Sequence, residues 1–489
     1  MERRAGILLP VFSLPGRFGQ GDLGPEAFRL LDGLASAGIR IWQVLPLSPC
    51  AYRGSPYASA SAFAGNRYLI SVDQLAGDGL IDAAPSPVPA DDAAEAALRD
   101  AALDSAWRRF DSGGAGHLRS AFEAFVSAPE QAPWLEDWAL FLAIASEQGG
   151  RRWTEWPEPL ARRNPEALAA ARSRLAREID RERFVQFLFF RQWAAMHAAA
   201  ASRGIAIFGD LPIYVAHGSA DVWAHPELFE LDERGEPLAV SGVPPDYFSK
   251  TGQRWGSPLY RWDRCREEGW KWWIDRFRAN LRLADLVRID HFRGFAAYWR
   301  IAASEPTAVV GEWRPGPGRE IFDAARQALG ELPFVAEDLG VITSDVALLR
   351  DALGFPGMRV LQFGFAQDDS PHLPHRHVAN AVAYTGTHDN DTANGWFARA
   401  SADERRRAAD YTGAGDGGFA RALVRAAFES VAETVVAPLQ DVLELGSEAR
   451  LNTPGTVEGN WRWQAPADAF APERAGWLRR LSAATGRAR

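Results

Sequence analysis

The chain has 489 residues, of which 47% are hydrophobic and 24% charged, and its formal net charge is −9. This mildly acidic composition argues against binding to nucleic acid or to an anionic membrane. The two cysteines, Cys50 and Cys265, lie outside any CxxC motif, which argues against a disulfide framework or a zinc site. No stretch approaches the ~18 apolar residues that span a bilayer. The apolar run before Pro10 is too short for a signal peptide, so a cytoplasmic location is expected.

Eight short apolar runs end in polar or turn residues, with helical patterns between them. They lie at 6–14, 39–49, 205–215, 286–292, 334–340, 359–365, 381–390 and 449–456. Runs that are continuously apolar, rather than alternating, indicate strands buried on both faces, as in a parallel sheet. Eight such strands separated by helices predict an α/β fold, the (β/α)8 TIM barrel.

Two intervals between these runs are too long for a simple strand–helix unit. The first, about 50–200, includes long helical patterns such as "RFVQFLFFRQWAAMHAAAASRG" and predicts a largely helical insertion after the second strand. The second, about 212–284, is rich in aromatic residues, Gly and Pro, and predicts a loop over the cleft after the third strand. We therefore expect residues 1–489 to form a single catalytic barrel domain with two large insertions.

The chain contains 19 tryptophans. For any single Trp, packing in the hydrophobic core is the simpler interpretation. The alternative is that exposed rings stack on the flat apolar faces of a ligand, either a sugar or a base, and the acidic charge argues against bases.

Acidic residues gather where the predicted strands end, which is where barrel enzymes carry their chemistry. These residues are Asp210, Asp290, Glu337, Asp338, Asp389 and Asp391. For one such acid, helix capping or pairing with an arginine is the simpler explanation. Burying unpaired carboxylates is costly, so acids at the ends of several barrel strands indicate a function.

Two of these carboxylates have sequence neighbours that suit them to the two different roles that glycosyl transfer requires. One carboxylate must attack the anomeric carbon while the other donates a proton to the leaving oxygen. In "LVRIDHFRGF", Arg288 and His291 flank Asp290, and as cations they are expected to keep it ionised. In "FVAEDLG", apolar residues precede Glu337 and favour its protonated form.

Two further patterns have simpler interpretations. "GAGDGG" fits a dinucleotide-binding glycine motif but follows a helical pattern rather than a strand. The histidines of "PHLPHRH" are interleaved with Pro and Arg, which favours a solvated loop over a metal site. We expect no metal and no cofactor.

The motifs taken together resemble the amylomaltase family, the bacterial 4-α-glucanotransferases or disproportionating enzymes of the α-amylase-like group. The matching stretches are "GDLG", "GSPYASASAFAGN", "GDLPIYVAHGSADVWAHPELF", "PPDYFSKTGQRWGSPLYRW", "VRIDHFRGF", "VAEDLG", "YTGTHDNDT", "LNTPGT" and "NWRW". They occur in the expected order over almost the whole chain. The combination is highly specific, although no single motif is.

The resemblance implies transfer of an α-1,4-glucan segment to the 4-hydroxyl of another glucan or of glucose. The mechanism it implies is a retaining double displacement through a covalent glycosyl-enzyme. Asp290 would be the nucleophile, Glu337 the acid/base and Asp389 a third carboxylate that grips the sugar. The substrate-binding residues it implies are Tyr57, Ser55, Asp210, Tyr247, Phe248, Gln253, Trp255, Arg288, His291, His388 and Asn460.

The expected partners are malto-oligosaccharides and other α-1,4-glucans, with no nucleic acid and no membrane. A hydrolase on the same scaffold is one alternative, because only the acceptor differs. A catalytically inactive glucan-binding protein is another, and retention of all three carboxylates argues against it. A sugar-phosphate aldolase would need a Schiff-base lysine at a strand end, whereas Lys250 and Lys271 lie elsewhere.

Overall fold

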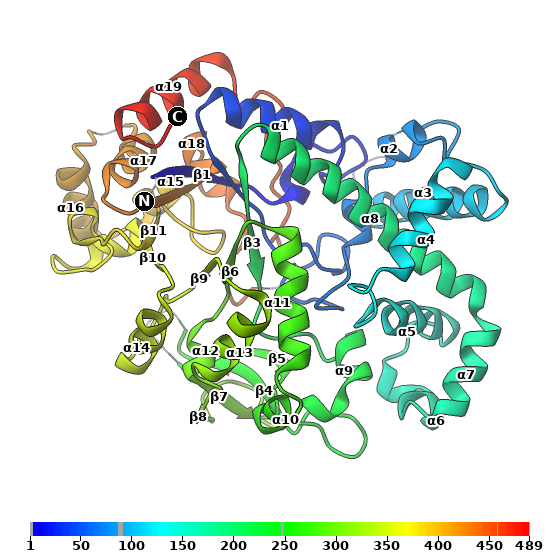
Figure 1. Cartoon of the computed structure of the whole chain (residues 1–489). Coiled ribbons are helices and arrows are strands. Elements are labelled where there is room, and N and C mark those ends of the chain that lie inside the picture. The colour runs from blue at the N-terminus through cyan, green and yellow to red at the C-terminus, as the bar shows by residue number, and fades with distance from the viewer. Residues whose placement is uncertain (1–2, 87–90, 246–248, 416, 457, 489) are drawn as a thin grey trace.

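The computed structural model describes residues 3–86, 91–245, 249–415, 417–456 and 458–488. At its centre, parallel strands close into a barrel in the order β1-β12-β11-β10-β9-β6-β3-β2 (Figure 1). The strands are β1 (Arg4–Leu8), β2 (Ile41–Gln43), β3 (Ala206–Leu211), β6 (Leu286–Ile289), β9 (Phe334–Ala336), β10 (Gly357–Val360), β11 (Ala381–Tyr384) and β12 (Thr434–Pro438). The predicted (β/α)8 fold is therefore confirmed.

Seven of the eight predicted runs overlap barrel strands, and the eighth prediction is wrong. Residues 449–456 form a 3-10 turn and a loop, and the eighth strand is β12, whose sequence is "TVVAP". This strand is fully buried and pairs with both β11 and β1. It is short and lies close behind a helix, so its apolar run merged with the helical pattern in the sequence.

Apolar side chains from the strands fill the interior of the barrel, as the fold requires. This inner cluster comprises Leu8, Ile41, Phe208, Val335, Met358, Val360, Val382, Tyr384 and Val436. A larger apolar cluster lies between the barrel and the helices that surround it. The helices after the barrel strands are α1 (Pro25–Ser36), α8 (Ala176–Ser202), α11 (Lys271–Leu283), α13 (Glu320–Leu329), α14 (Ser344–Leu353), α17 (Phe419–Glu429) and α19 (Pro472–Ala484). Short helices near the ends of the strands are α12 (Arg293–Ala296), α15 (Ala393–Arg399), α16 (Ala402–Thr412) and α18 (Leu439–Val442).

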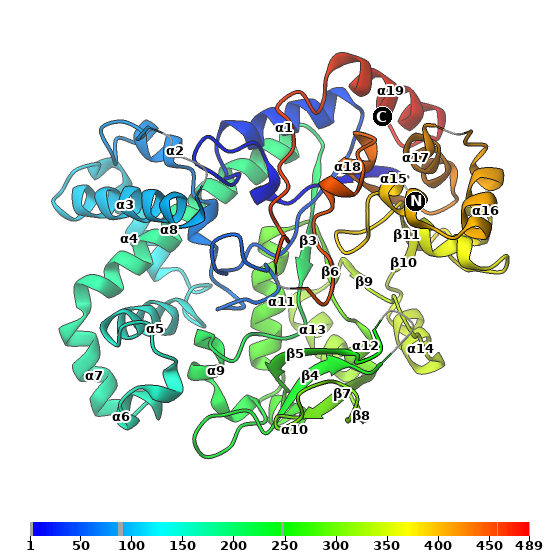
Figure 2. The same cartoon turned by 180° about the vertical axis from the view of Figure 1, so that it is seen from behind.

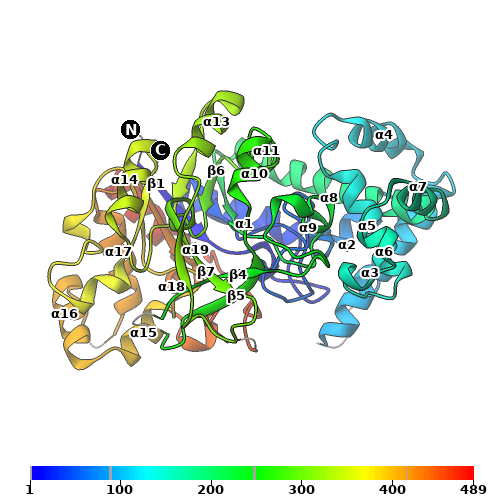
Figure 3. The ribbon, with the colours of Figure 1, turned by 90° about the horizontal axis from the view of Figure 1, so that it is seen from below.

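The segment between β2 and β3 is largely helical and extends to one side of the barrel (Figures 2 and 3). Besides α8 it contains α2 (Val72–Gly77), α3 (Asp92–Asp111), α4 (Arg119–Ser127), α5 (Leu135–Glu147), α6 (Glu158–Ala161) and α7 (Pro165–Arg174). Arg99 of α3 attaches this segment to the loop after β1. Its buried guanidinium donates hydrogen bonds to the carbonyls of Phe18, Gln20 and Tyr68 and lies 3.2 Å from Asp22.

A second, antiparallel sheet was not predicted. Its order is β5-β4-β7-β8, from strands β4 (Ala239–Val243), β5 (Gln253–Pro258), β7 (Ala297–Ala302) and β8 (Glu312–Pro315). The expected loop at 212–284 thus contains two strands, together with α9 (Ala220–Ala224) and α10 (Trp262–Glu267). The sheet is assembled from residues on both sides of β6, so no single stretch of sequence reveals it.

Most of the tryptophans belong to the core, as the simpler interpretation held. Trp42, Trp193, Trp223 and Trp273 are among the largest fully buried side chains. Two are notably exposed, Trp255 on β5 at 40% and Trp313 on β8 at 41%, and both lie in the second sheet.

Arg487 closes the N-terminal end of the barrel and generates a prediction about stability. Its guanidinium, in a side chain 1% exposed, donates to the carbonyl oxygens of Arg4, Phe428, Ser430, Ala432 and Glu433. Replacing it with leucine removes five hydrogen bonds at once, and the carbonyl of Ala432 loses its side-chain donor, which should lower the free energy of unfolding by about 3 kcal/mol.

Thermal and chemical denaturation of Arg487→Leu measure this loss. The control is Arg480→Leu, because Arg480 is exposed on α19. A change below about 0.5 kcal/mol is expected for the control, as for other surface substitutions. Equal stability of the two variants would contradict the assigned role of Arg487.

Candidate active site

Acidic side chains from several barrel strands meet at the C-terminal end of the barrel. Asp210 lies in β3, directly opposite Arg288 in the register of β3 and β6. Asp290 follows β6, and Glu337 follows β9, the next strand around the barrel. The main-chain N–H of Glu337 donates to the carbonyl of Ile289 at 3.1 Å, so the two acidic positions are held against each other by the sheet.

Arg288 joins two of these carboxylates. One terminal nitrogen donates to both oxygens of Asp210 at 2.8 and 2.7 Å, and the other donates to Oδ1 of Asp290 at 2.6 Å. The side chains of Arg288 and Asp210 are almost fully buried, whereas that of Asp290 is 26% exposed. A ligand can therefore reach Asp290, whose position is fixed from below by an arginine that cannot move away from its own buried partner.

Burial raises the pKa of Asp290 to about 8, with Asp210, Glu337 and Asp389 adding to the rise and Arg288 opposing it. Burial also raises the pKa of Glu337, against the opposing effects of Arg288 and of two main-chain N–H groups. Those N–H groups belong to His291, 2.9 Å from Oε2, and Leu339, 2.8 Å from Oε1. Both shifts are upward, which favours retention of a proton by this carboxyl pair.

The prediction that His291 acts as a cation beside Asp290 is wrong. Burial, with a smaller effect from Arg293, lowers the pKa of His291 to about 3, so the ring is neutral. Its main chain, rather than its charge, contributes to the site through the hydrogen bond to Glu337. The expectation that cations alone keep Asp290 ionised is also too simple, because one terminal nitrogen of Arg288 is engaged by Asp210.

Asp389 is held by the loop that was predicted to be the eighth strand. Asn452 donates to Oδ1 of Asp389 at 2.6 Å, and Arg450 donates to the main-chain carbonyl of Asp389 at 2.8 Å. Nε2 of His388 lies 3.4 Å from the other carboxylate oxygen. Sequence reasoning missed Arg450 and Asn452 as site residues, although the "LNTPGT" motif contained the signal.

Tyr57 lies beside this group. Its hydroxyl donates to Oδ2 of Asp210 at 2.6 Å, and its ring stacks on His388 with centroids 5.2 Å apart and planes inclined by 15°. Trp461, a further residue missed from the sequence, lies near both rings. Ser55 accepts a hydrogen bond from the main-chain N–H of Tyr57 at 3.3 Å and so shapes the turn that presents the tyrosine.

The second sheet contributes Gln253 and Trp255, both on β5. The indole N–H of Trp255 donates to Oε1 of Gln253 at 3.1 Å, and the Trp255 ring meets His291 edge-on with centroids 4.7 Å apart. Tyr247 and Phe248, the other two aromatic residues expected here, lie outside the described residues.

Asn460 does not offer its amide to the site. Its oxygen accepts the N–H of Thr453 at 2.9 Å, and its NH2 group donates to the carbonyl and hydroxyl of Thr456. Asn460 therefore shapes the loop that contains Asn452, and any effect on substrate is through that loop.

Two of the acids found at strand ends have structural roles. Asp338 accepts the N–H of Met358 at 2.7 Å and pairs with Arg350. Asp391 accepts the hydroxyl of Ser447 at 2.8 Å and pairs with Arg399. The simpler explanation, pairing with an arginine, thus holds for these two and separates them from the four acids of the site.

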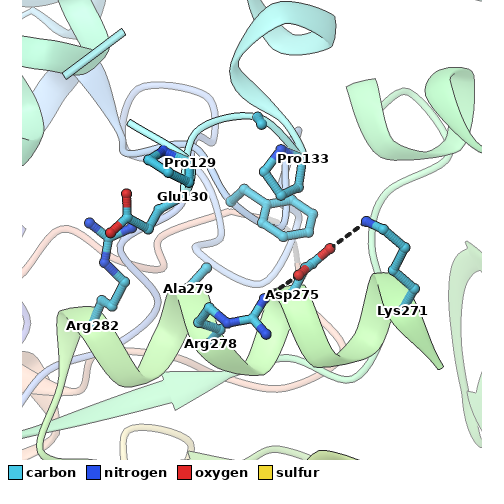
Figure 4. A pocket seen from close by; sticks show the side chains of 10 residues that line it. Pro129, Glu130, Pro133, Lys271, Asp275, Arg278, Ala279 and Arg282 are labelled. Carbon is cyan, nitrogen blue, oxygen red and sulfur yellow. Dashed lines mark hydrogen bonds and ion pairs between the residues drawn. The ribbon is translucent and has the colours of Figure 1, made fainter. Parts of the chain in front are cut away.

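A cavity of about 530 Å³ lies away from this site, between α11 and the segment at 129–133 (Figure 4). Asp275 at its edge is paired with both Lys271 and Arg278. None of the predicted site residues lines it.

Within the described ranges, no group of three or more His, Cys, Asp or Glu side chains is arranged to hold a metal ion. None of the described helices is long and apolar enough to cross a membrane.

A family model described as 4-alpha-glucanotransferase matches residues 9–468. The chain belongs to the 4-α-glucanotransferase family. It is 49% identical to a 4-alpha-glucanotransferase from Thermus thermophilus, over 100% of this chain and 99% of the relative. It is 48% identical to one from Synechocystis, over 99% of this chain and 98% of the relative. The chain is therefore an enzyme of the 4-α-glucanotransferase type.

Solved structures agree with this membership. An amylomaltase from Streptococcus agalactiae, in complex with acarbose, matches with a TM-score of 0.95 and 36% identity over 100% of both chains. At 19% identity, an amylomaltase from Corynebacterium glutamicum matches with a TM-score of 0.74 over 99% of this chain and 75% of that one. The latter shows that the fold persists at low identity.

The Arg288 bridge leads to a prediction for the 4-α-glucanotransferase reaction. A lysine at this position keeps the charge but cannot donate to two carboxylates through separate nitrogens at fixed angles. We expect Arg288→Lys to lower kcat/KM on maltotriose by about 10²-fold or more while the circular dichroism spectrum is unchanged. The control is Arg300→Lys on β7, where a half-buried arginine pairs with Glu230. A loss of less than about tenfold for Arg288→Lys would contradict this prediction.

Proposed function

We propose that the enzyme transfers a segment of an α-1,4-glucan to the 4-hydroxyl of an acceptor glucan or glucose, with Asp290 as the nucleophile and Glu337 as the acid/base. The observation that carries this proposal is the pair of carboxyl groups that adjacent strands hold against each other, with Asp290 bonded to Arg288 and Glu337 bonded to two main-chain N–H groups. Retaining glycosyl transfer requires such a pair, in which one group is charged and the other protonated.

The first question is which carboxyl carries the shared proton. Asp290 accepts a 2.6 Å hydrogen bond from a guanidinium, whereas Glu337 accepts its two hydrogen bonds from neutral N–H groups. A charge-assisted bond stabilises a carboxylate about twice as well as a neutral one. This supports an ionised Asp290 and a protonated Glu337 in the active form.

In the first step, Asp290 attacks the anomeric carbon while Glu337 donates its proton to the oxygen of the departing sugar. Oδ1 of Asp290 is engaged with Arg288, and no donor among the described residues contacts Oδ2, which is the oxygen proposed to attack. In the second step, the acceptor 4-hydroxyl gives its proton to Glu337 and attacks the anomeric carbon. The ester bond to Asp290 breaks as the new glycosidic bond forms, which leaves Asp290 ionised and Glu337 protonated, the starting state of the enzyme.

Asp389 is proposed to bind sugar hydroxyls and favour the distorted ring of the transition state. Its carboxylate is 43% exposed, and the amide of Asn452 sets its direction. Tyr57 and His388, whose stacked rings stand beside Asp210, are proposed to line the subsite for the sugar that reacts. The side chains proposed for both roles are already held by contacts within the protein, so little further ordering of these side chains is needed when the sugar binds.

Acceptor binding is proposed to depend on Trp255 and Gln253, together with Tyr247 and Phe248, which precede β5 in the sequence and lie outside the described residues. Trp255 is 40% exposed and its indole N–H is already bonded to Gln253, so its face is free to stack on a sugar. Water at ~55 M competes with the acceptor, and good positioning of the acceptor is worth ~7–11 kcal/mol.

The natural partners are proposed to be malto-oligosaccharides and other α-1,4-glucans. Two unpaired cysteines support the proposed cytoplasmic location.

Incubation with maltotriose tests both the reaction and the nucleophile. The wild-type enzyme should produce glucose together with maltodextrins longer than maltotriose, whereas a hydrolase would produce glucose and maltose alone. Asp290→Asn should lose about 10⁴-fold or more in kcat, because an amide cannot form the glycosyl ester. Asp285→Asn, at the opposite end of β6, is the control and should retain activity within about threefold. A nearly active Asp290→Asn would exclude Asp290 as the nucleophile.

The pH dependence follows from the raised pKa values. Burial raises the pKa of Glu337, the proposed acid, so Glu337 keeps its proton to higher pH than a free carboxyl does. Once Glu337 has lost this proton, no acid remains to protonate the leaving oxygen. We expect kcat/KM on maltotriose to fall on the alkaline side of its optimum. A rate that stays constant to pH 10 would contradict this assignment.

A further inference from the structure

His291 has a left-handed backbone conformation, which is uncommon for residues other than glycine. Its φ is +51°. It occupies the turn between β6 and α12, directly after Asp290. Backbone strain of this kind persists only where the surrounding structure enforces it, and it gathers at functional sites.

This conformation directs the main-chain N–H of His291 at Oε2 of Glu337, 2.9 Å away. The N–H of Leu339 holds the other oxygen at 2.8 Å. Both oxygens of Glu337 are thus fixed by main-chain donors, one from each side of the carboxyl group. Leu339 lies on the same loop as Glu337, so His291 provides the contact that ties this carboxyl group to the strand of Asp290.

The imidazole ring itself makes packing contacts. Its Nε2 is buried and has no hydrogen-bond partner in the described part of the chain. One side of the ring rests on Gly294, where a Cβ would stand 3.2 Å from Cδ2 of His291. Trp255 meets the ring edge-on at 4.7 Å. A ring enclosed in this way keeps the turn in its left-handed conformation rather than binding or transferring a proton.

We propose that His291 is a positioning residue, which aims its main-chain N–H at Glu337, and that Trp255 of β5 holds it in that conformation. The proposal rests on the assignment of Glu337 as the acid/base. His291 lies between Trp255, whose exposed indole is proposed to bind the acceptor, and Glu337, the proposed acid/base that acts on the acceptor. Occupancy of the acceptor side and orientation of Glu337 are then coupled.

Substitutions at His291 that differ in backbone preference test the proposal. Asparagine tolerates the left-handed region, whereas β-branched valine does not. In His291→Val the N–H turns away, the charged form of Glu337 loses a donor, and its pKa rises. In the pH profile of kcat/KM, the alkaline limb, where the rate falls, should move up by about one pH unit. The plateau of the profile should fall about tenfold or more. In His291→Asn the limb should stay within about 0.3 units of wild type.

The charged groups that face Glu337 are Arg288, Asp290 and Asp338, and Asp389 and Asp210 lie beyond them. Neither variant changes any of these, so a shift of the limb reports the lost N–H. Equal losses in both variants, with the limb unmoved, would overturn the proposal and leave His291 as a sugar-binding or packing residue.

Two controls separate this proposal from others. Ala115→Val places the same β-branched side chain at a φ of +52° far from the site, and its pH profile should match wild type. With α-maltosyl fluoride as donor, the leaving group needs no proton, so His291→Val should lose little in the first step. If Glu337→Gln loses as much with the fluoride as with maltotriose, the acid assignment fails, whatever the result at His291.

The link to the second sheet is tested at Trp255. Trp255→Ala should move the alkaline limb in the same direction as His291→Val, by a smaller amount, and weaken acceptor binding. Trp313→Ala removes an equally exposed indole from β8 of the same sheet and should leave the limb in place. A Trp255→Ala enzyme with weak acceptor binding and a wild-type limb would show that the ring does not act through His291.

Discussion

The site depends on the hydrogen bonds that Arg288, at the end of β6, donates to two carboxylates. Arg288 is buried, always charged and bonded to carboxylates on two sides, one in its own strand segment and one in the neighbouring strand. Removing the arginine would leave Asp210 and Asp290 without their shared cation, and loss of the partner of a buried charge is strongly destabilising. The barrel positions both partners through backbone pairing, so the arrangement needs no flexible element.

The same network accounts for the unusual proton affinities. Four carboxyl groups share the end of the barrel with one buried guanidinium, so the negative charge is only partly balanced. Burial is the main cause of the raised pKa values of Asp290 and Glu337, and the remaining repulsion between the carboxylates adds to it. Asp338 and Asp391 show the contrast: each is matched by an arginine and by further donors, and each contributes to structure.

Much of the fold could be predicted from sequence because buried parallel strands are continuously apolar and end in turn residues. The runs that contain β3, β6 and β11 are of this kind, and their terminal acids were found with them. The strand Thr434–Pro438 was missed because it lies close behind a helix with a similar apolar pattern. The second sheet was missed because its strands pair across β6, a relation that no local pattern records. Asn452 and Trp461 reach the site through loop geometry, which depends on tertiary contacts.

The groups proposed to make and break bonds lie at the ends of adjacent barrel strands, whereas those proposed to select the sugar come from elsewhere. Asn452 belongs to the loop after α18, and Trp255 belongs to a sheet outside the barrel. Loops and appended sheets tolerate substitution and insertion far better than paired barrel strands do. Chemical competence and product size are therefore separable in this architecture. Descendants of one such enzyme could come to accept different sugars by remodelling the periphery, with the carboxyl pair at the end of the barrel left intact.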